Sequence, residues 1–323
     1  MAEISKKIRF YDKDKLDNIN TETLKLFKKY KIDMELRELS PKTIYQYEND
    51  LQHWFIYIYD NQANQCITNL DEDDITEFLY FCKTEGNNTE RMKRRMSSIS
   101  AFYKYLRKKK VIKENPMEFI DRPKRGVPII VQTFLSQEQV DLMRQKLKEY
   151  RENGGYNGQM YQLYALLSLS TMARVNAISN LKWEQIDLEE RVCNDVLEKE
   201  GYSVTLYFSD EVKDLLLELK LYREENNIND GGYVFFSSIN GDIQPITNGT
   251  LNQWCKKIGE MINVPTLHAH DFRHSGSQLL KLKGMPIEEI SELLNHSGLD
   301  VTKKHYLRQD KQKIQKSKDK YIF

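Results

Sequence analysis

Residues 267–274 read Leu-His-Ala-His-Asp-Phe-Arg-His, so three histidines and one arginine fall within seven positions. A solvated surface does not need that density of imidazole and guanidinium groups, and two kinds of site are compatible with it. His270 and His274 lie one helical turn apart, with His268 close by, which is a spacing that metal ligands use. In the other interpretation, Arg273 offers its planar fork of donors to phosphate oxygens and His270 supplies a titratable imidazole.

The rest of the chain favours phosphate over metal. No cluster of Asp, Glu or Cys at a familiar ligand spacing occurs elsewhere in the sequence. Arg273 would also put a fixed positive charge beside the ion. We therefore expect no metal and no other cofactor. Downstream apolar residues predict two packed helices with a turn at 284–286, and this pair would present His296 just beyond its end.

Three more residues extend the set. Arg174 closes the apolar segment 161–172, which predicts a buried helix. Lys199 falls near the turn of a predicted hairpin, because residues 192–208 are rich in β-branched and aromatic side chains. Tyr306 lies in a polar stretch near the C-terminus. Cations that converge on a phosphate, together with an oxygen nucleophile, suggest covalent cleavage of a DNA strand.

The first third of the chain is predicted to be helical. Ser40 followed by Pro41 is an N-cap with proline at the first helical position, and apolar residues recur behind it at helical spacing. Thr89 opens a longer helix whose apolar face is Met92, Met96, Ile99, Tyr103 and Leu106. Basic side chains are expected off that face, where they can meet phosphates: Arg91, Arg94, Arg95, Lys104 and Lys108.

A domain linker is predicted at residues 122–128, where turn residues combine with positive charge. Beyond it, Ser136-Gln-Glu-Gln139 is a capping box that begins a new folding unit. The expected architecture is mainly α-helical with a small antiparallel β-sheet. Residues 1–126 form a helical domain, and residues 127–323 form a mixed, mostly helical domain with a C-terminal tail.

Composition limits the class of protein. The 323 residues include 40% hydrophobic and 30% charged residues, which is typical of a soluble globular chain. No apolar run approaches the ~20 residues of a membrane span, and the four widely separated cysteines favour a reducing cytoplasm. The net charge of +1 hides segregation, because residues 89–125 carry thirteen Lys or Arg against four acidic residues. A second basic run at 303–320 suits a polyanion held from more than one side.

Four segments in order resemble the signature boxes of tyrosine recombinases, also called phage integrases. They are residues 171–183 (Thr-Met-Ala-Arg-Val-Asn-Ala-Ile-Ser-Asn-Leu-Lys-Trp), 270–274 (His-Asp-Phe-Arg-His), 293–297 (Leu-Leu-Asn-His-Ser) and 302–306 (Thr-Lys-Lys-His-Tyr). The part from Ser40 to Pro116 looks like the helical, SAM-like core-binding domain of that family. The resemblance covers nearly the whole chain and implies a two-domain clamp on DNA.

The resemblance assigns roles by position. It implies that Arg174 and Arg273 are the catalytic arginines, His270 and His296 the two histidines, and Tyr306 the nucleophile. Lys199 matches the β-hairpin lysine, although the flanking Glu198 and Glu200 make its surroundings unusual. Two positions depart from the family. Ala177 stands where an acidic residue usually follows the first arginine, and Asn295 replaces a glycine.

The resemblance also implies a 3′-phosphotyrosine intermediate, formed without metal or ATP. The implied partner is double-stranded DNA with inverted-repeat core sites, bound by a homotetramer with or without a directionality or accessory factor, and no membrane. The tail after Tyr306 is expected to dock on a neighbouring protomer. The expected DNA contacts lie on the Ser40 helix, the Thr89 helix and the linker: Lys42, Thr43, Arg91, Arg94, Arg95, Lys104, Lys124 and Arg125.

Two alternatives stay open on sequence alone. The first is a catalytically weak or inactive DNA-binding accessory protein of the same fold. Ala177 and the surroundings of Lys199 are compatible with it, because both depart from the family pattern. The second is topoisomerase-like nicking and rejoining with the same tyrosine. The biological task is equally open between integration, excision and multimer resolution.

Overall fold

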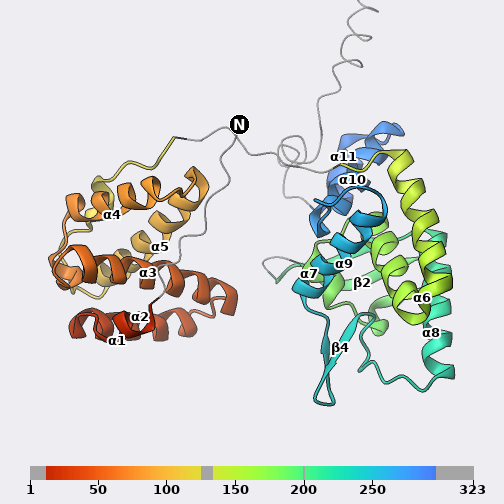
Figure 1. The fold of residues 1–323 in the computed structure, drawn as a ribbon, viewed down its shortest axis with the longest axis horizontal. Coiled ribbons are helices and arrows are strands. Elements are labelled where there is room, and N and C mark those ends of the chain that lie inside the picture. Colours follow the sequence, from red (N-terminus) through yellow and green to blue (C-terminus); the bar gives the residue numbers. More distant parts are fainter. Residues whose placement is uncertain (1–11, 125–133, 199–200, 296–323) are drawn as a thin grey trace, which may run out of the picture. The chain divides into compact units, whose positions relative to one another are not determined.

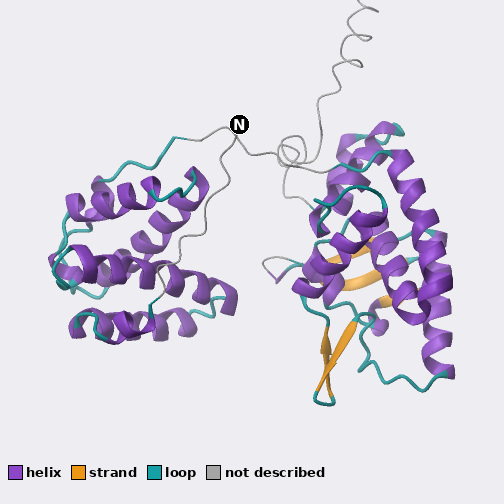
Figure 2. Cartoon of the chain, in the orientation of Figure 1, coloured by secondary structure: helices purple, strands orange, loops and turns teal. Residues whose placement is uncertain are grey.

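The computed structural model describes residues 12–124, 134–198 and 201–295. The chain divides into two compact units, Met1–Ile130 and Val131–Phe323, which Figure 1 shows in ribbon form. The described residues are mostly helical, and their few strands form small antiparallel sheets (Figure 2), which confirms the predicted fold class. Within these ranges, no helix combines the length and apolar character needed to cross a membrane.

The described part of the first unit consists of helices and their connections. Its elements are α1 (Lys13–Asp17), α2 (Thr21–Leu36), α3 (Pro41–Asn61), the 3-10 turn η1 (Ile67–Asn69), α4 (Glu72–Thr84), α5 (Thr89–Lys108) and η2 (Pro116–Phe119).

These helices begin at N-cap residues that can be recognised in the sequence. The Ser40 hydroxyl accepts the backbone N–H of Thr43 at the start of α3, with Pro41 at the first helical position. The predicted apolar face of α5, from Met92 to Leu106, is buried as expected. It packs in an aromatic core with edge-to-face and stacked rings: Phe27, Tyr30, Trp54, Phe55, Phe102 and Tyr103.

The second unit places short strands among longer helices. Its elements are α6 (Gln137–Thr171), α7 (Val175–Ser179), η3 (Trp183–Gln185), β1 (Ile186–Asp187), β2 (Val192–Leu197), β3 (Ser203–Tyr207), α8 (Asp210–Glu225), β4 (Phe236–Ile239), β5 (Asp242–Pro245), α9 (Asn248–Met261), α10 (Ala269–Leu282) and α11 (Ile287–Leu293). The strands β1, β2 and β3 form one antiparallel sheet, and β4 pairs with β5 in a second.

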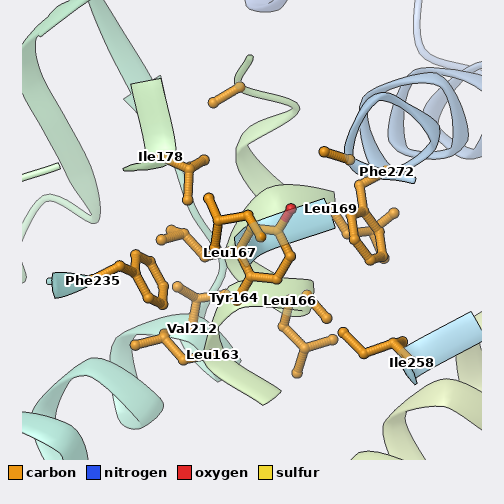
Figure 3. Close-up of a cluster of buried hydrophobic side chains, with 14 of the residues drawn as sticks. Leu163, Tyr164, Leu166, Leu167, Leu169, Ile178, Val212, Phe235, Ile258 and Phe272 are labelled. Atoms are coloured by element: carbon orange, nitrogen blue, oxygen red, sulfur yellow. The ribbon is translucent and has the colours of Figure 1, made fainter. Parts of the chain in front are cut away.

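Helix α6 is the central element of the second unit. The capping box at Ser136 forms as predicted, with reciprocal bonds to Gln139. A break at Gly155, whose φ of 52° and ψ of −133° are not helical, divides α6 into two helical parts, and the helix predicted at 161–172 lies in the second part. Tyr164 of α6 lies among leucines and the rings of Phe235 and Phe272, which it meets edge to face (Figure 3).

One glycine allows α10 to approach the end of α6. A Cβ atom on Gly276 would lie 2.6 Å from the Leu169 carbonyl oxygen and 2.7 Å from the Met172 Cγ atom. Real Cβ atoms do not approach other atoms that closely, so any side chain here pushes the two helices apart.

We expect Gly276→Ala to lower the free energy of unfolding by about 1–3 kcal/mol, because the methyl group overpacks this contact. Gly249→Ala is the matched control, since its Cβ would meet only the Thr247 Oγ1 atom at 3.5 Å. Alanine is the better helix former, so the control should be as stable as the parent chain or slightly more so. Urea unfolding measures both, and equal midpoints would contradict the close approach.

Candidate active site

The first arginine is placed by the end of α6. Met172 adopts the left-handed conformation, with φ of 52° and ψ of 24°, and terminates the helix. Arg174 follows as the N-cap residue of α7, with its side chain 27% exposed. Its Nη1 atom pairs with the Glu198 carboxylate, and its backbone N–H donates to Glu198 Oε1 at 3.3 Å.

The second arginine lies on α10, where its side chain is only 1% exposed. Arg273 Nη1 donates to the Met172 carbonyl oxygen at 2.6 Å, and Nη2 donates to the Leu294 carbonyl oxygen at 2.5 Å. The same Nη1 atom lies 3.7 Å from Glu198 Oε1. The guanidinium therefore joins the ends of α6, α11 and β2.

A small apolar cluster supports these contacts. Met172, Ile290 and Leu294 are buried together, so the side chains of Met172 and Leu294 pack while their carbonyl groups accept from Arg273. Asn295 follows with φ of 50°. Asparagine is among the residues that tolerate this left-handed conformation, which explains how it replaces the glycine expected there.

Glu198 is the residue that sequence reasoning missed. It directly follows β2, its side chain is 2% exposed, and its two oxygens bring Arg174 and Arg273 together. The usual acid position, Ala177, is instead buried in the hydrophobic core. The sequence held a sign of this exchange, because an acid is missing at position 177 and an unusual acid stands at position 198. No periodic pattern connects the two positions, so the sequence alone does not pair them.

His270 lies in the first turn of α10, close enough to both arginines to feel their charge. Partial desolvation of its ring lowers the pKa of His270 from the ordinary value, and Arg273, His268 and Arg174 lower it further. The lowered pKa favours a neutral imidazole at neutral pH. A neutral ring can accept a proton or a hydrogen bond next to the arginine pair.

The other two histidines of the segment have structural partners. His268 caps α10, and its Nδ1 atom lies 3.0 Å from the Asp271 carboxylate. The ring of His274 lies 6.0 Å from that of Phe134, between centroids. Among residues 12–124, 134–198 and 201–295, no three His, Cys, Asp or Glu side chains are grouped so as to hold a metal ion.

Three predicted catalytic residues, Lys199, His296 and Tyr306, lie outside the described residues. The expected C-terminal docking segment and Arg125 do so as well. The other three predicted catalytic residues are described, and the structure brings them together: Arg174, Arg273 and His270.

The predicted DNA contacts of the first unit fall into different environments. Lys42, Lys104 and Lys124 are exposed, whereas Thr43 and Arg91 are partly buried. The Oγ1 atom of Thr43 lies 2.8 Å from the hydroxyl of its helix cap. Arg94 is 41% exposed and makes two hydrogen bonds to the buried Asp50 carboxylate, at 3.1 and 2.8 Å.

Arg95 corrects the expectation for this helix. Its side chain is 1% exposed, donates to Asn87 Oδ1 at 3.2 Å and lies 3.9 Å from Asp50 Oδ1, so it does not face a phosphate here. The reason is helical geometry, because Arg95 is three residues after Met92 and four before Ile99, on the buried face.

Comparison with known proteins gives one consistent result. The model of the phage integrase family matches residues 133–313, and that of the phage integrase N-terminal SAM-like domain matches residues 12–110. The tyrosine recombinase XerC of Oceanobacillus iheyensis is 26% identical, over 82% of this chain and 85% of that protein. XerC of Pediococcus pentosaceus is 24% identical, over 93% of this chain and 98% of that protein.

Solved structures agree on the fold. The XerH site-specific recombinase bound to a palindromic difH substrate, in its post-cleavage complex, aligns with a TM-score of 0.69 at 19% identity, covering 88% of this chain and 81% of that one. The Tn1549 transposon integrase in complex with transposon right-end DNA aligns with a TM-score of 0.64 at 17% identity, covering 92% and 98%.

We expect the His270 imidazole to titrate below the ordinary histidine pKa of about 6.5, because desolvation and nearby cations disfavour its protonated form. Arg174→Gln should raise that pKa without restoring the ordinary value, since desolvation is the largest cause. Arg144→Gln removes an arginine that pairs with Glu211 instead and serves as the control. NMR of labelled histidines measures the titration, and an unchanged midpoint in Arg174→Gln would contradict the proximity.

Proposed function

The chain belongs to the phage integrase family, and from that membership we propose that it is a site-specific DNA recombinase that cleaves and rejoins strands through a covalent tyrosine intermediate. One observation supports this most directly. Arg174 and Arg273, about a hundred positions apart in sequence, meet at a single carboxylate with His270 beside them. Two cations held that closely suit one phosphodiester group.

The chemistry follows from the residue types. Tyr306 would attack phosphorus, forming a 3′-phosphotyrosine ester and releasing a 5′-hydroxyl. A phenol with a pKa near ~10 is mostly protonated at neutral pH, so a neutral His270 beside the cations is suited to take its proton. Arg174 and Arg273 would neutralise charge on the non-bridging oxygens as the transition state forms.

Two further residues complete the proposed reaction. Lys199 would give a proton to the leaving 5′-oxygen, and His296 would hydrogen-bond a phosphate oxygen. The ester preserves the energy of the broken bond, so rejoining needs no ATP. The same residues act in reverse when the released 5′-hydroxyl, or that of a partner strand, attacks the ester.

The proposed substrate is duplex DNA with inverted-repeat core sites, bound by a homotetramer that exchanges strands in pairs. Exposed lysines of the helical unit, such as Lys42 and Lys104, are proposed phosphate contacts. The domain division proposed from the sequence, at 126/127, assigns core binding to the first part and catalysis to the second. A DNA substrate also agrees with the cytoplasmic location that the cysteine pattern favours.

A second candidate is a DNA-binding accessory protein of the same fold with little catalysis. The apolar environment of Ala177 favours it, because the acid that usually supports the first arginine is missing there. Covalent chemistry separates the two candidates, since only the recombinase forms a bond to DNA.

We expect the protein to form a covalent adduct with a nicked suicide duplex carrying a site selected for binding from a random pool. Tyr306→Phe should abolish the adduct, because it removes the phenolic oxygen that attacks phosphorus. Tyr321→Phe, another change in the C-terminal tail, should retain it. A denaturing gel measures the adduct. Its absence with the parent chain would favour the accessory protein, and an adduct without exchanged products would favour nicking and rejoining alone.

We expect Lys104→Gln to weaken DNA binding on all sequences and to reduce the slope of log affinity against log salt by about 1, because one phosphate contact is lost. Lys83→Gln is the control, since Lys83 is also exposed but lies on the acidic helix α4. Fluorescence anisotropy at several salt concentrations measures both slopes. Equal slopes for the two variants would show that Lys104 does not contact a DNA phosphate.

A further inference from the structure

The Glu198 carboxylate occupies the place where the two arginines converge. Oε2 pairs with Arg174 Nη1, while Oε1 accepts the Arg174 backbone N–H at 3.3 Å and lies 3.7 Å from Arg273 Nη1. Both oxygens of the carboxylate therefore face donors of the pair. With its side chain 2% exposed, the carboxylate is almost completely shielded from water.

We propose that Glu198 is an internal stand-in for the DNA phosphate: it holds the arginine pair in the free protein and must leave when a phosphate binds. The identity of the displacing group rests on the proposed function, whereas the occupation by Glu198 rests on geometry alone. Glu198 is then a competitor for the phosphate site and not another contact to DNA.

The chemistry of the two anions makes them interchangeable at this position. A carboxylate and a phosphodiester each carry one negative charge and present two oxygens that accept hydrogen bonds. Either one balances the arginine pair. Both together would place two anions side by side, so binding of one disfavours the other.

Arg273 cannot move away from this competition. Two of its N–H groups already donate to the carbonyl oxygens of Met172 and Leu294, which anchor it in a nearly water-free position. Since these anchors fix the guanidinium, a phosphate has to come to Arg273, whose Nη1 atom lies 3.7 Å from Glu198 Oε1.

The same geometry has a second interpretation, in which Glu198 permanently orients the arginines in place of the acid missing at Ala177. The two interpretations predict opposite effects of removing the carboxylate. A displaced competitor leaves behind a stronger anion site. A permanent orienting group leaves behind a weaker one, because the arginines lose their arrangement.

The test is thermal unfolding of the full chain in increasing inorganic phosphate, with sodium chloride added to keep ionic strength constant. Glu198→Ala removes the charge and most of the side-chain volume. Glu198→Gln removes the charge and keeps the volume. Asp195→Asn removes a charge from the exposed side of the same strand and is the control. Binding to the folded state stabilises it by RT ln(1 + [L]/Kd), where [L] is the phosphate concentration, so the rise in melting temperature with phosphate yields dissociation constants.

We expect both Glu198 variants to melt below the parent without phosphate and to bind phosphate at least tenfold more tightly than the parent or Asp195→Asn. Because Glu198→Gln keeps the side-chain volume, it tests the idea even if Glu198→Ala fails to fold. Equal or weaker phosphate binding by Glu198→Gln would overturn the proposal.

A second measurement, of affinity for DNA, distinguishes failure of this proposal from failure of the proposed function. Glu198→Gln should bind its selected duplex at least tenfold more tightly than the parent, and a lower affinity would count against displacement. The phosphate result involves no strand cleavage. Failure of adduct formation at Tyr306 would therefore reject the recombinase and leave the phosphate result intact, whereas equal phosphate binding would reject the stand-in alone.

Discussion

The candidate active site depends on burying the guanidinium group of Arg273. A cation withdrawn from water is tolerated only where hydrogen bonds and opposite charge replace its hydration. The carbonyl groups of Met172 and Leu294 supply the bonds, and Glu198 supplies the charge. Because these acceptors lie at the ends of three different elements, the arginine holds the ends of α6, α11 and β2 together. The left-handed Met172 and the small Gly276 are the local features that allow this convergence.

Most of the fold could be predicted because its signals are local and periodic. The caps at Ser40 and Ser136 form as expected, and the buried face of α5 follows the helical repeat of its apolar residues. The helix predicted at 161–172 forms as well, beyond a break in α6 at Gly155, where φ of 52° and ψ of −133° are not helical. Local propensity and periodicity therefore predict where these helices exist.

The site was less predictable, because its partners are distant in sequence. The sequence boxes marked Arg174, His270 and Arg273 as a set, and the structure brings these three together. They did not reveal Glu198, since only the folded chain brings the residue after β2 to α10. Arg95 is the opposite case. Its charge suggests a DNA contact, although its helical spacing puts it on the buried face of α5, where Asp50 is a counter-charge.

The position of the acid changes what the site can do. An acid at 177 would belong to the short helix α7, among buried apolar side chains, and could not leave without disturbing the core. Residue 198 lies beyond the last residue of β2 and outside the hydrophobic core, so withdrawal of its side chain leaves that core in place. Both positions can neutralise the arginines in the absence of DNA, which burial of Arg273 requires. Only the second makes the counter-charge removable, and a removable counter-charge lets the phosphate take over the same role without leaving either arginine uncompensated.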